Sequence, residues 1–229
     1  MDVTPVCNVC QSLFNLNTLT LGPAAYYDSL PMCIIDAVFS IGVRYTSTQN
    51  VVKNYCTYYG LREFNPECDS QGDTHTVSQF IDHISASGIE KSADEIFKNH
   101  QRTSTRGGIL KADAALRFAK VLQNHGIETL ADFSQKGLSE ETEAELRKIP
   151  GQKSGLSTRY FFMLAGDESQ SKPDRHVLRF LKEHTGRNYS IEQAQQMLTE
   201  TVLSLRVEYP NVTVRLLDHA IWDYMAHRK

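Results

Sequence analysis

The sequence predicts an all-α protein, and three observations support this prediction. Three segments have the spacing of a capping box, a Ser or Thr followed three residues later by Gln or Glu; they begin at Thr76, Ser92 and Ser190. Apolar residues recur at helical spacing behind each of these segments. Alternating polar and apolar runs, which indicate strands, are scarce, and the best is NTLTLG near Leu19. We therefore expect amphipathic helices packed on a shared core.

Further helices are indicated by the same periodicity at four other places: from Pro31, near Lys111, after Ser139 and after Pro210. Segments rich in Ser, Gly, Asn and Asp favour turns and are the expected linkers: 63–73, 99–108 and 166–172. No internal repeat interrupts this pattern of helices and linkers.

The composition is that of an ordinary globular protein, with 41% hydrophobic and 22% charged residues among 229. No run approaches the roughly 18 uncharged apolar residues that a membrane span needs, and the first ten residues lack the order of a secretory signal. We expect a cytoplasmic protein with no membrane partner, and a monomer. The net charge of −3 argues against a uniformly basic surface but leaves room for a local basic face.

The five cysteines are odd in number and scattered, so free thiols are expected rather than a disulfide framework: Cys7, Cys10, Cys33, Cys56 and Cys68. The CNVC run has the spacing of metal ligands, but no second pair follows it. We interpret Cys7 and Cys10 as two thiols near a fraying terminus and expect no metal site.

A tight helical hairpin is the strongest local feature. One helix is expected from Ser139 to Lys148, acidic at its start and basic at its end, as the helix dipole favours. Pro150 and Gly151 end it, and helical periodicity resumes at Leu156. The unpaired N–H groups at the start of the second helix, together with the basic residues around them, favour phosphate binding at this turn. The alternative is a plain corner between helices whose charges face water.

This hairpin resembles the helix-hairpin-helix motif of the endonuclease III superfamily of DNA glycosylases, which is followed by an aspartate at the start of the next helix. Four residues match the first half of the motif: Leu146, Ile149, Pro150 and Gly151. The segment KPDRHVLRF, residues 172–180, resembles the aspartate segment and places Asp174 at the family's essential carboxylate.

The resemblance implies a two-lobed fold and double-stranded DNA as the partner. Residues 30–168 would form a helical barrel lobe, and residues 1–29 and 169–229 a second lobe carrying the aspartate. Residues 31–60 resemble the family's helix, turn and helix ahead of the barrel core, with Tyr45 near the position that probes the DNA stack. No cysteine follows Cys68, so the iron-sulfur cluster of some members is not expected, and neither is another cofactor.

The resemblance also implies which residues contact DNA. The hairpin contacts would be Pro150, Gly151, Gln152, Lys153, Ser154 and Gly155. Lys153 stands where the motif has its second glycine, and we interpret it as a phosphate contact. The lysine nucleophile of the bifunctional members would fall at or next to Gly155, so the monofunctional branch is indicated.

Four more residues are candidates for contact with DNA, each with an alternative. Arg102 and Arg106 lie on a Gly- and Ser-containing loop that would touch phosphate or only water. Tyr160 would line the base pocket, although the three neighbouring aromatics 160–162 cannot share one helix face and at least two should be core. Trp222, on the last helix, would line the pocket or have a structural role.

The chemistry implied for Asp174 is hydrolysis of the N-glycosidic bond of a modified or damaged base flipped out of the duplex. A carboxylate would stabilise the oxocarbenium-like sugar and orient the attacking water. Three alternatives stay open: Asp174 only caps a helix, the hairpin belongs to a non-catalytic DNA-binding protein, or the chain is a helical interaction protein. Repair and defence against modified foreign DNA fit equally.

Overall fold

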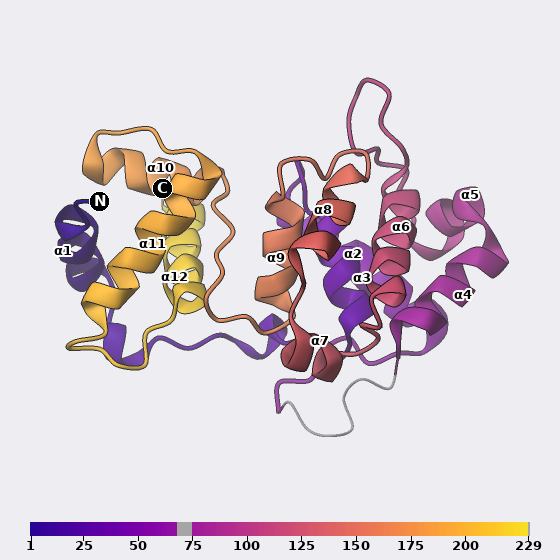
Figure 1. Cartoon of the computed structure of the whole chain (residues 1–229), viewed down its shortest axis with the longest axis horizontal. Helices are drawn as coiled ribbons and strands as arrows, with labels where there is room; N and C mark the ends of the chain where they lie inside the picture. Colours follow the sequence, from indigo (N-terminus) through magenta and orange to yellow (C-terminus); the bar gives the residue numbers. More distant parts are fainter. Residues whose placement is uncertain (68–74, 229) are drawn as a thin grey trace. The chain divides into compact units, whose positions relative to one another are not determined.

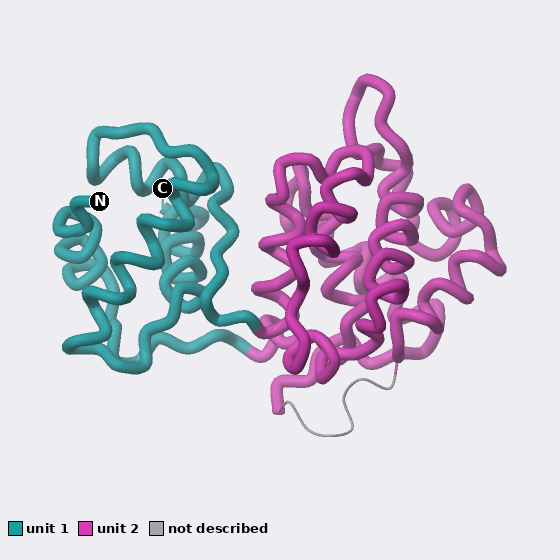
Figure 2. Tube along the Cα trace, in the orientation of Figure 1, with its two compact units in different colours: residues 1–22, 167–229 teal, residues 23–166 magenta. Residues whose placement is uncertain are grey.

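The computed structural model describes residues 1–67 and 75–228, and its regular elements are helices, with isolated bridges at Tyr27–Phe64 and Arg102–Leu110 (Figure 1). The all-α class is confirmed. The chain forms two compact units, residues 1–22 with 167–229 (unit 1) and residues 23–166 (unit 2), as Figure 2 shows. The division predicted from the sequence was 1–29 with 169–229, and 30–168. Part of the predicted linker 63–73 lies outside the described residues.

Unit 1 contains both chain ends and four helices that pack on one another (Figure 1). They are α1 (Thr4–Leu13), α10 (Arg175–Thr185), α11 (Ile191–Leu205) and α12 (Val214–His227), with a 3-10 turn, η1 (Leu16–Thr18), after α1. The first two residues of the NTLTLG run therefore belong to a 3-10 turn, and the run forms no strand. Phe180, Leu198, Leu217 and Ile221 are fully buried in the core of this unit.

Unit 2 begins with a 3-10 turn, η2 (Pro23–Ala25), and contains the other helices. They are α2 (Leu30–Phe39), α3 (Tyr45–Tyr59), α4 (Val77–Ser87), α5 (Ile89–Lys91), the π-helical turn η3 (Ser92–Ile96), α6 (Lys111–Asn124), α7 (Leu130–Lys136), α8 (Glu140–Lys148) and α9 (Leu156–Leu164). All ten residues of α2 are buried, and α2 packs against α3, α4, α6 and α9. Helix α2 is thus the centre of unit 2.

The C-terminal end of α2 is capped by a buried lysine from another helix. The Lys111 ammonium, at the start of α6, donates to the carbonyl oxygens of Phe39 and Ile41 at 2.8 Å each. It also donates to Gln101 Oε1 at 3.3 Å. These acceptors replace the water that burial removes from the ammonium. Lys111 therefore ties the loop before α6 to the end of α2.

Two of the three predicted capping boxes are confirmed, at Thr76 and Ser190, where both reciprocal hydrogen bonds are present. The prediction at Ser92 is wrong. The helix begins earlier, after Gly88, whose φ of 77° breaks the preceding helix α4. The Ser92 hydroxyl lies inside the helix and donates to the Gly88 carbonyl at 2.7 Å, so it is not available as a cap.

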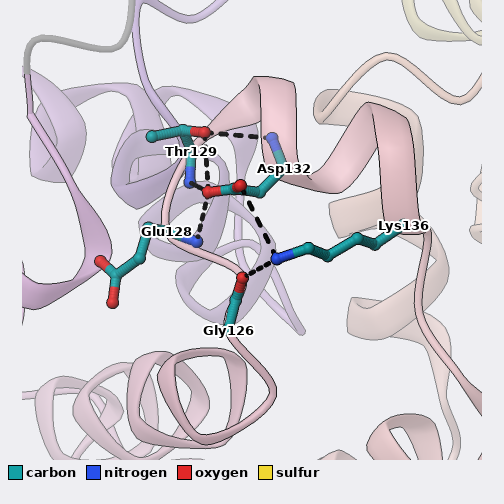
Figure 3. Close-up of polar contacts among 5 residues, drawn as sticks. All are labelled: Gly126, Glu128, Thr129, Asp132 and Lys136. Carbon is teal, nitrogen blue, oxygen red and sulfur yellow. Dashed lines mark hydrogen bonds and ion pairs between the residues drawn. The ribbon is translucent and has the colours of Figure 1, made fainter.

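Helix α7 has a capping box that the sequence analysis missed (Figure 3). The Thr129 hydroxyl accepts the Asp132 N–H, and Asp132 Oδ2 accepts the N–H groups of Glu128 and Thr129, both at 3.1 Å (Figure 3). Burial raises the pKa of Asp132, but these bonds and the Lys136 charge outweigh it, so the pKa lies below its usual value. The box was missed because its third helical residue is Asp and not Glu or Gln.

The N-terminal cysteines are part of the core of unit 1, and their expected place near a fraying terminus is wrong. Cys7 and Cys10 are buried on one face of α1, next to Val6 in the same core. Burial raises the pKa of Cys10 to about 12, with Cys7 acting in the same direction. The spacing of three residues serves helix packing here.

Two histidines and a tyrosine form a buried cluster in unit 2. The Tyr55 hydroxyl lies 2.6 Å from His75 Nε2 and 3.2 Å from His83 Nδ1. The Tyr59 ring stacks on His83 with ring centroids 3.8 Å apart. Burial, together with the nearby His83, lowers the pKa of His75 to about 4. His75 is therefore uncharged at neutral pH.

We expect the free energy of unfolding to fall as the pH drops from about 6.5 to about 4. In this window the unfolded chain binds a proton at His75 and the folded chain does not. The stability that the uncharged His75 contributes is therefore complete above pH 6.5 and is lost progressively between pH 6.5 and about 4. The loss is on the order of 3 kcal/mol, measured by urea unfolding at a series of pH values. His75→Gln should flatten the slope and the exposed His100→Gln should not; equal slopes in wild type and His75→Gln would contradict the expectation.

Candidate functional site

The turn between α8 and α9, residues 149–155, has the geometry of a tight helical hairpin. The Gln152 N–H donates to the Ile149 carbonyl at 2.9 Å, and the Gly155 N–H to the Gln152 carbonyl at 3.0 Å. The left-handed positions are Gly151, with φ of 90°, and Gly155, with φ of 71°. Lys98 is the one non-glycine residue with positive φ in the described part of the chain. Lys153 therefore needs no left-handed backbone, although it stands where the motif has glycine.

The predicted hairpin contacts divide into an exposed and a buried set. The exposed residues are Pro150, Gly151, Lys153 and Ser154, and the buried ones are Gln152 and Gly155. Gln152 Oε1 accepts a hydrogen bond from the Ser157 hydroxyl inside the turn. The Gln152 side chain thus holds the turn together instead of reaching outward.

A guanidinium lies over Gly155. A Cβ atom at this position would be 2.7 Å from Arg147 Nη2, and the same guanidinium is 4.0 Å from Glu143. The position at which the resemblance would place a lysine nucleophile is therefore occupied by a glycine covered by an arginine. The charge of Arg147 lies beside the start of α9, which is also the positive end of the helix dipole.

The loop before α6 packs against this turn through Thr103. A Cβ atom on Gly151 would lie 2.4 Å from Thr103 Cβ, so the glycine permits the close approach. The loop folds back on itself, with the Thr103 N–H donating to Ile109 at 2.9 Å and Arg102 Nη1 donating to Gly108 at 2.8 Å. Arg106 is exposed at its tip. Unit 2 thus brings the loop with Arg102 and Arg106 onto the hairpin turn.

Three tyrosines of unit 2 surround a buried carboxylate that the sequence analysis missed. Asp36, on α2, is fully buried, and its Oδ2 accepts the hydroxyls of Tyr27 at 2.9 Å and Tyr160 at 3.2 Å. Burial raises the pKa of Tyr45, Asp36 raises it further, and a side-chain hydrogen bond with Tyr160 opposes them. The signal in the sequence was a lone acid within an apolar helix.

This cluster determines how the predicted pocket residues are oriented. Tyr45 begins α3 and is half-buried, and its hydroxyl is directed toward Tyr160 and Asp36. The aromatic residues 160, 161 and 162 are all buried, which confirms that at least two belong to the core. Tyr45 therefore offers the face or edge of its ring, and not its hydroxyl, to anything outside.

Asp174 belongs to unit 1 and is the N-cap of α10. Its Oδ1 accepts the N–H groups of His176 at 2.7 Å and Val177 at 3.3 Å. The residue is half-buried, and the preceding Pro173 is buried. Within the described part of the chain, both hydrogen bonds that the carboxylate accepts go to Oδ1. Oδ1 thus accepts both capping hydrogen bonds from α10, and Oδ2 accepts neither of them.

The segment ahead of Asp174 is anchored at three points to α11 and to the start of α12. Glu168 accepts the Thr213 hydroxyl at 2.6 Å and Arg215 Nη1 at 3.0 Å. The Ser171 hydroxyl donates to Gln195 Oε1 at 2.6 Å. The Lys172 N–H donates to Asp218 Oδ1 at 3.0 Å. The backbone that leads to Asp174 is therefore ordered by side chains more than twenty residues away.

Trp222 lies close to the start of α10. Its ring centroid is 6.2 Å from that of His176 and 6.3 Å from that of His219, and the His219 ring is stacked on it. Burial lowers the pKa of His219. His176 follows Asp174 by two residues, so unit 1 brings Trp222 near the helix end that carries the predicted carboxylate.

An open hollow of about 410 Å³ lies elsewhere on unit 1, lined by α1, the segment after it and α12. Phe14, Leu19 and Tyr224 contribute to its wall. Neither Asp174 nor Trp222 is among its lining residues, so the hollow does not mark the predicted base pocket.

Among the residues that the structure describes, no group of three or more His, Cys, Asp or Glu is placed to hold a metal ion. No helix in the same residues has the length and apolar character of a membrane span.

The comparisons with known proteins give one result. No match to the chain was found among curated proteins or among solved structures. The model of a domain of unknown function, DUF8548, matches residues 5–226. The chain therefore belongs to the DUF8548 family.

Proposed function

We propose that the protein is a monofunctional DNA glycosylase of the helix-hairpin-helix type, with the two-lobed fold of that superfamily. It would hydrolyse the N-glycosidic bond of a modified or damaged base in double-stranded DNA. Unit 2 would bind phosphates through the hairpin turn, and unit 1 would supply the Asp174 carboxylate. The resemblance of residues 146–151 and 172–180 to the superfamily motifs suggests this function.

The geometry of the hairpin turn is the observation that carries the proposal. Its two left-handed residues are glycines, so the turn is compatible with the motif even though Lys153 replaces one motif glycine. Lys153 is exposed, and Arg147 lies beside the start of α9. Phosphate oxygens would accept from backbone N–H groups at this helix end, with the positive charges of both side chains nearby. Arg106, on the loop packed against the turn, would add a second phosphate contact.

The Asp174 carboxylate would perform the chemistry. As the bond between the sugar C1′ and the base nitrogen breaks, positive charge develops on the sugar ring and the base leaves with the bonding electrons. A negative Oδ2 would stabilise that charge and accept the proton of the water that attacks C1′. The hydrogen bonds to Oδ1 hold the carboxylate in place before reaction. With Gly155 in place of a lysine, no amine stands at the position of the nucleophile, and Lys153 would contact phosphate instead.

A non-catalytic DNA-binding protein is the second candidate, and one observation favours it. The two hydrogen bonds from α10 explain Asp174 fully as a helix cap. Such a protein would keep the hairpin and bind phosphates without removing a base. It would share the steep salt dependence of a phosphate-binding surface, which a helical interaction protein would lack.

The test is an excision assay of the purified protein on duplexes that each carry one altered base, and on modified phage DNA. We expect strand breaks that appear only after alkali, because base removal by water leaves an abasic site intact. DNA affinity should fall steeply with salt, as counterions are released from contacted phosphates. Salt-dependent binding without excision on any substrate would favour the second candidate. Salt-independent binding would contradict both candidates.

A further inference from the structure

We propose that Asp218, on α12, is a positioning residue for the Asp174 carboxylate and acts through its hydrogen bond to the Lys172 backbone. The residue is buried, with 4% of its surface exposed, and it accepts the N–H of Lys172, two residues before Asp174. Its role in excision rests on the function proposed above, whereas its hydrogen bond and its charge state can be tested without DNA.

The hydrogen bond to Lys172 restrains the backbone two residues before Asp174. Pro173 removes one N–H donor from the segment and restricts its own φ, and the Asp174 N–H donates to the Lys172 carbonyl at 2.6 Å. The turn from Lys172 to Asp174 is therefore held to the body of unit 1 by Asp218 Oδ1. Loss of this acceptor would leave a buried N–H unsatisfied and free the turn to move.

The electrostatics around Asp218 favour its neutral form. Burial raises the pKa of Asp218 well above its usual value, and the Asp174 charge raises it further. The Lys172 N–H and ammonium act in the opposite direction. Arg215 and His219 are on α12 with Asp218, and Arg175 and His176 directly follow Asp174 at the start of α10.

A neutral Asp218 has a consequence for the pH profile. Near neutral pH, Asp218 positions Asp174 without competing for the cationic sugar. As the pH rises and Asp218 ionises, its charge repels the Asp174 carboxylate, and this repulsion displaces Asp174 although the Lys172 N–H bond itself becomes stronger. Excision should therefore show an alkaline decline as Asp218 ionises.

The kinetic test compares Asp218→Ala with Asp218→Asn under single-turnover conditions. Asp218→Ala should lower the excision rate by about 10- to 100-fold, because a small displacement of a catalytic group has this effect. Asn keeps an oxygen for the Lys172 N–H but cannot ionise, so Asp218→Asn should restore most of the rate and lack the alkaline decline. Asp223→Ala, which removes an exposed carboxylate from the same helix, should keep the wild-type pH profile.

The second arm is a titration of the ¹³C-labelled aspartate carboxyls by NMR in the protein without DNA. Asp218 should be protonated at pH 7, and Asp174→Asn should lower its pKa by removing the neighbouring charge. An ionised Asp218 at pH 7, or a wild-type excision rate in Asp218→Ala, would overturn the inference. If the wild type excises no base, the proposed function fails. The charge state of Asp218 is then still tested by this titration, and its hydrogen bond to Lys172 by faster exchange of the Lys172 amide in Asp218→Ala.

Discussion

Replacing Asp174 with asparagine is expected to lower the rate of base excision by about 10²- to 10³-fold, the usual effect of removing one stabiliser of a charged transition state. Asparagine loses the charge, but its oxygen can still accept the N–H groups of His176 and Val177. Because Asn and Asp cap helices about equally well, the stability of α10 should change little. Single-turnover rates, measured after alkali treatment, give the effect on chemistry. DNA affinity gives the effect on binding, and urea unfolding gives the effect on stability.

Two further variants separate the charge from the cap. Asp174→Ser keeps a capping oxygen without a charge and should match Asp174→Asn in excision. Ser190→Ala removes the cap of α11 in the same unit, which should cost about 1 kcal/mol of stability and leave the excision rate unchanged. If Ser190→Ala slows excision as strongly as Asp174→Asn does, Asp174 acts only through helix stability, and the glycosylase proposal is contradicted.

Replacing Gly151 with alanine should lower the free energy of unfolding by about 3 kcal/mol and weaken DNA binding. Two effects add at this position. The φ of 90° strains any residue with a Cβ, and that Cβ would lie 2.4 Å from Thr103 Cβ. The hairpin and the loop with Arg106 would have to separate, which would displace both proposed phosphate contacts. Urea unfolding and binding at several salt concentrations measure the two effects.

The collision can be distinguished from the backbone strain. Gly60 is in the left-handed helical region, with a φ of 66°, and has no heavy atom within 4 Å of an added Cβ, so Gly60→Ala should cost only the strain of about 1–2 kcal/mol. Adding Thr103→Gly to Gly151→Ala removes the opposing Cβ and should recover the difference. Equal costs for Gly151→Ala and Gly60→Ala would show that the loop does not press on the turn.

Local signals in the sequence were sufficient where the chain's own neighbours decide the structure. The boxes at Thr76 and Ser190 form as predicted because their hydrogen bonds join residues three apart. Ser92 has the same spacing, yet the positive φ of Gly88 starts the helix earlier. Helix α1 was missed because few of its residues face the core; Val6, Cys7 and Cys10 are the buried ones.

The two helices of the hairpin and the helix start at Asp174 could be predicted for the same local reason. Pro150 and Gly151 cannot continue a helix, and a proline followed by an aspartate favours a new helix start. The place of Lys153 in the turn could not be predicted, because the φ of a residue depends on how the hydrogen bonds of the whole turn close. In this turn Gly151 and Gly155 take the left-handed positions.

By itself, the sequence determined the all-α class, most of the helices and the order of hairpin and aspartate, since each depends on residues a few positions apart. Only the tertiary structure brought Asp36 to Tyr27 and Tyr160, and Lys172 to Asp218. These contacts join residues as many as 124 positions apart. Their energy comes from the burial of polar groups that must find partners, and which partners they find is decided by the packing of helices, which no local pattern records.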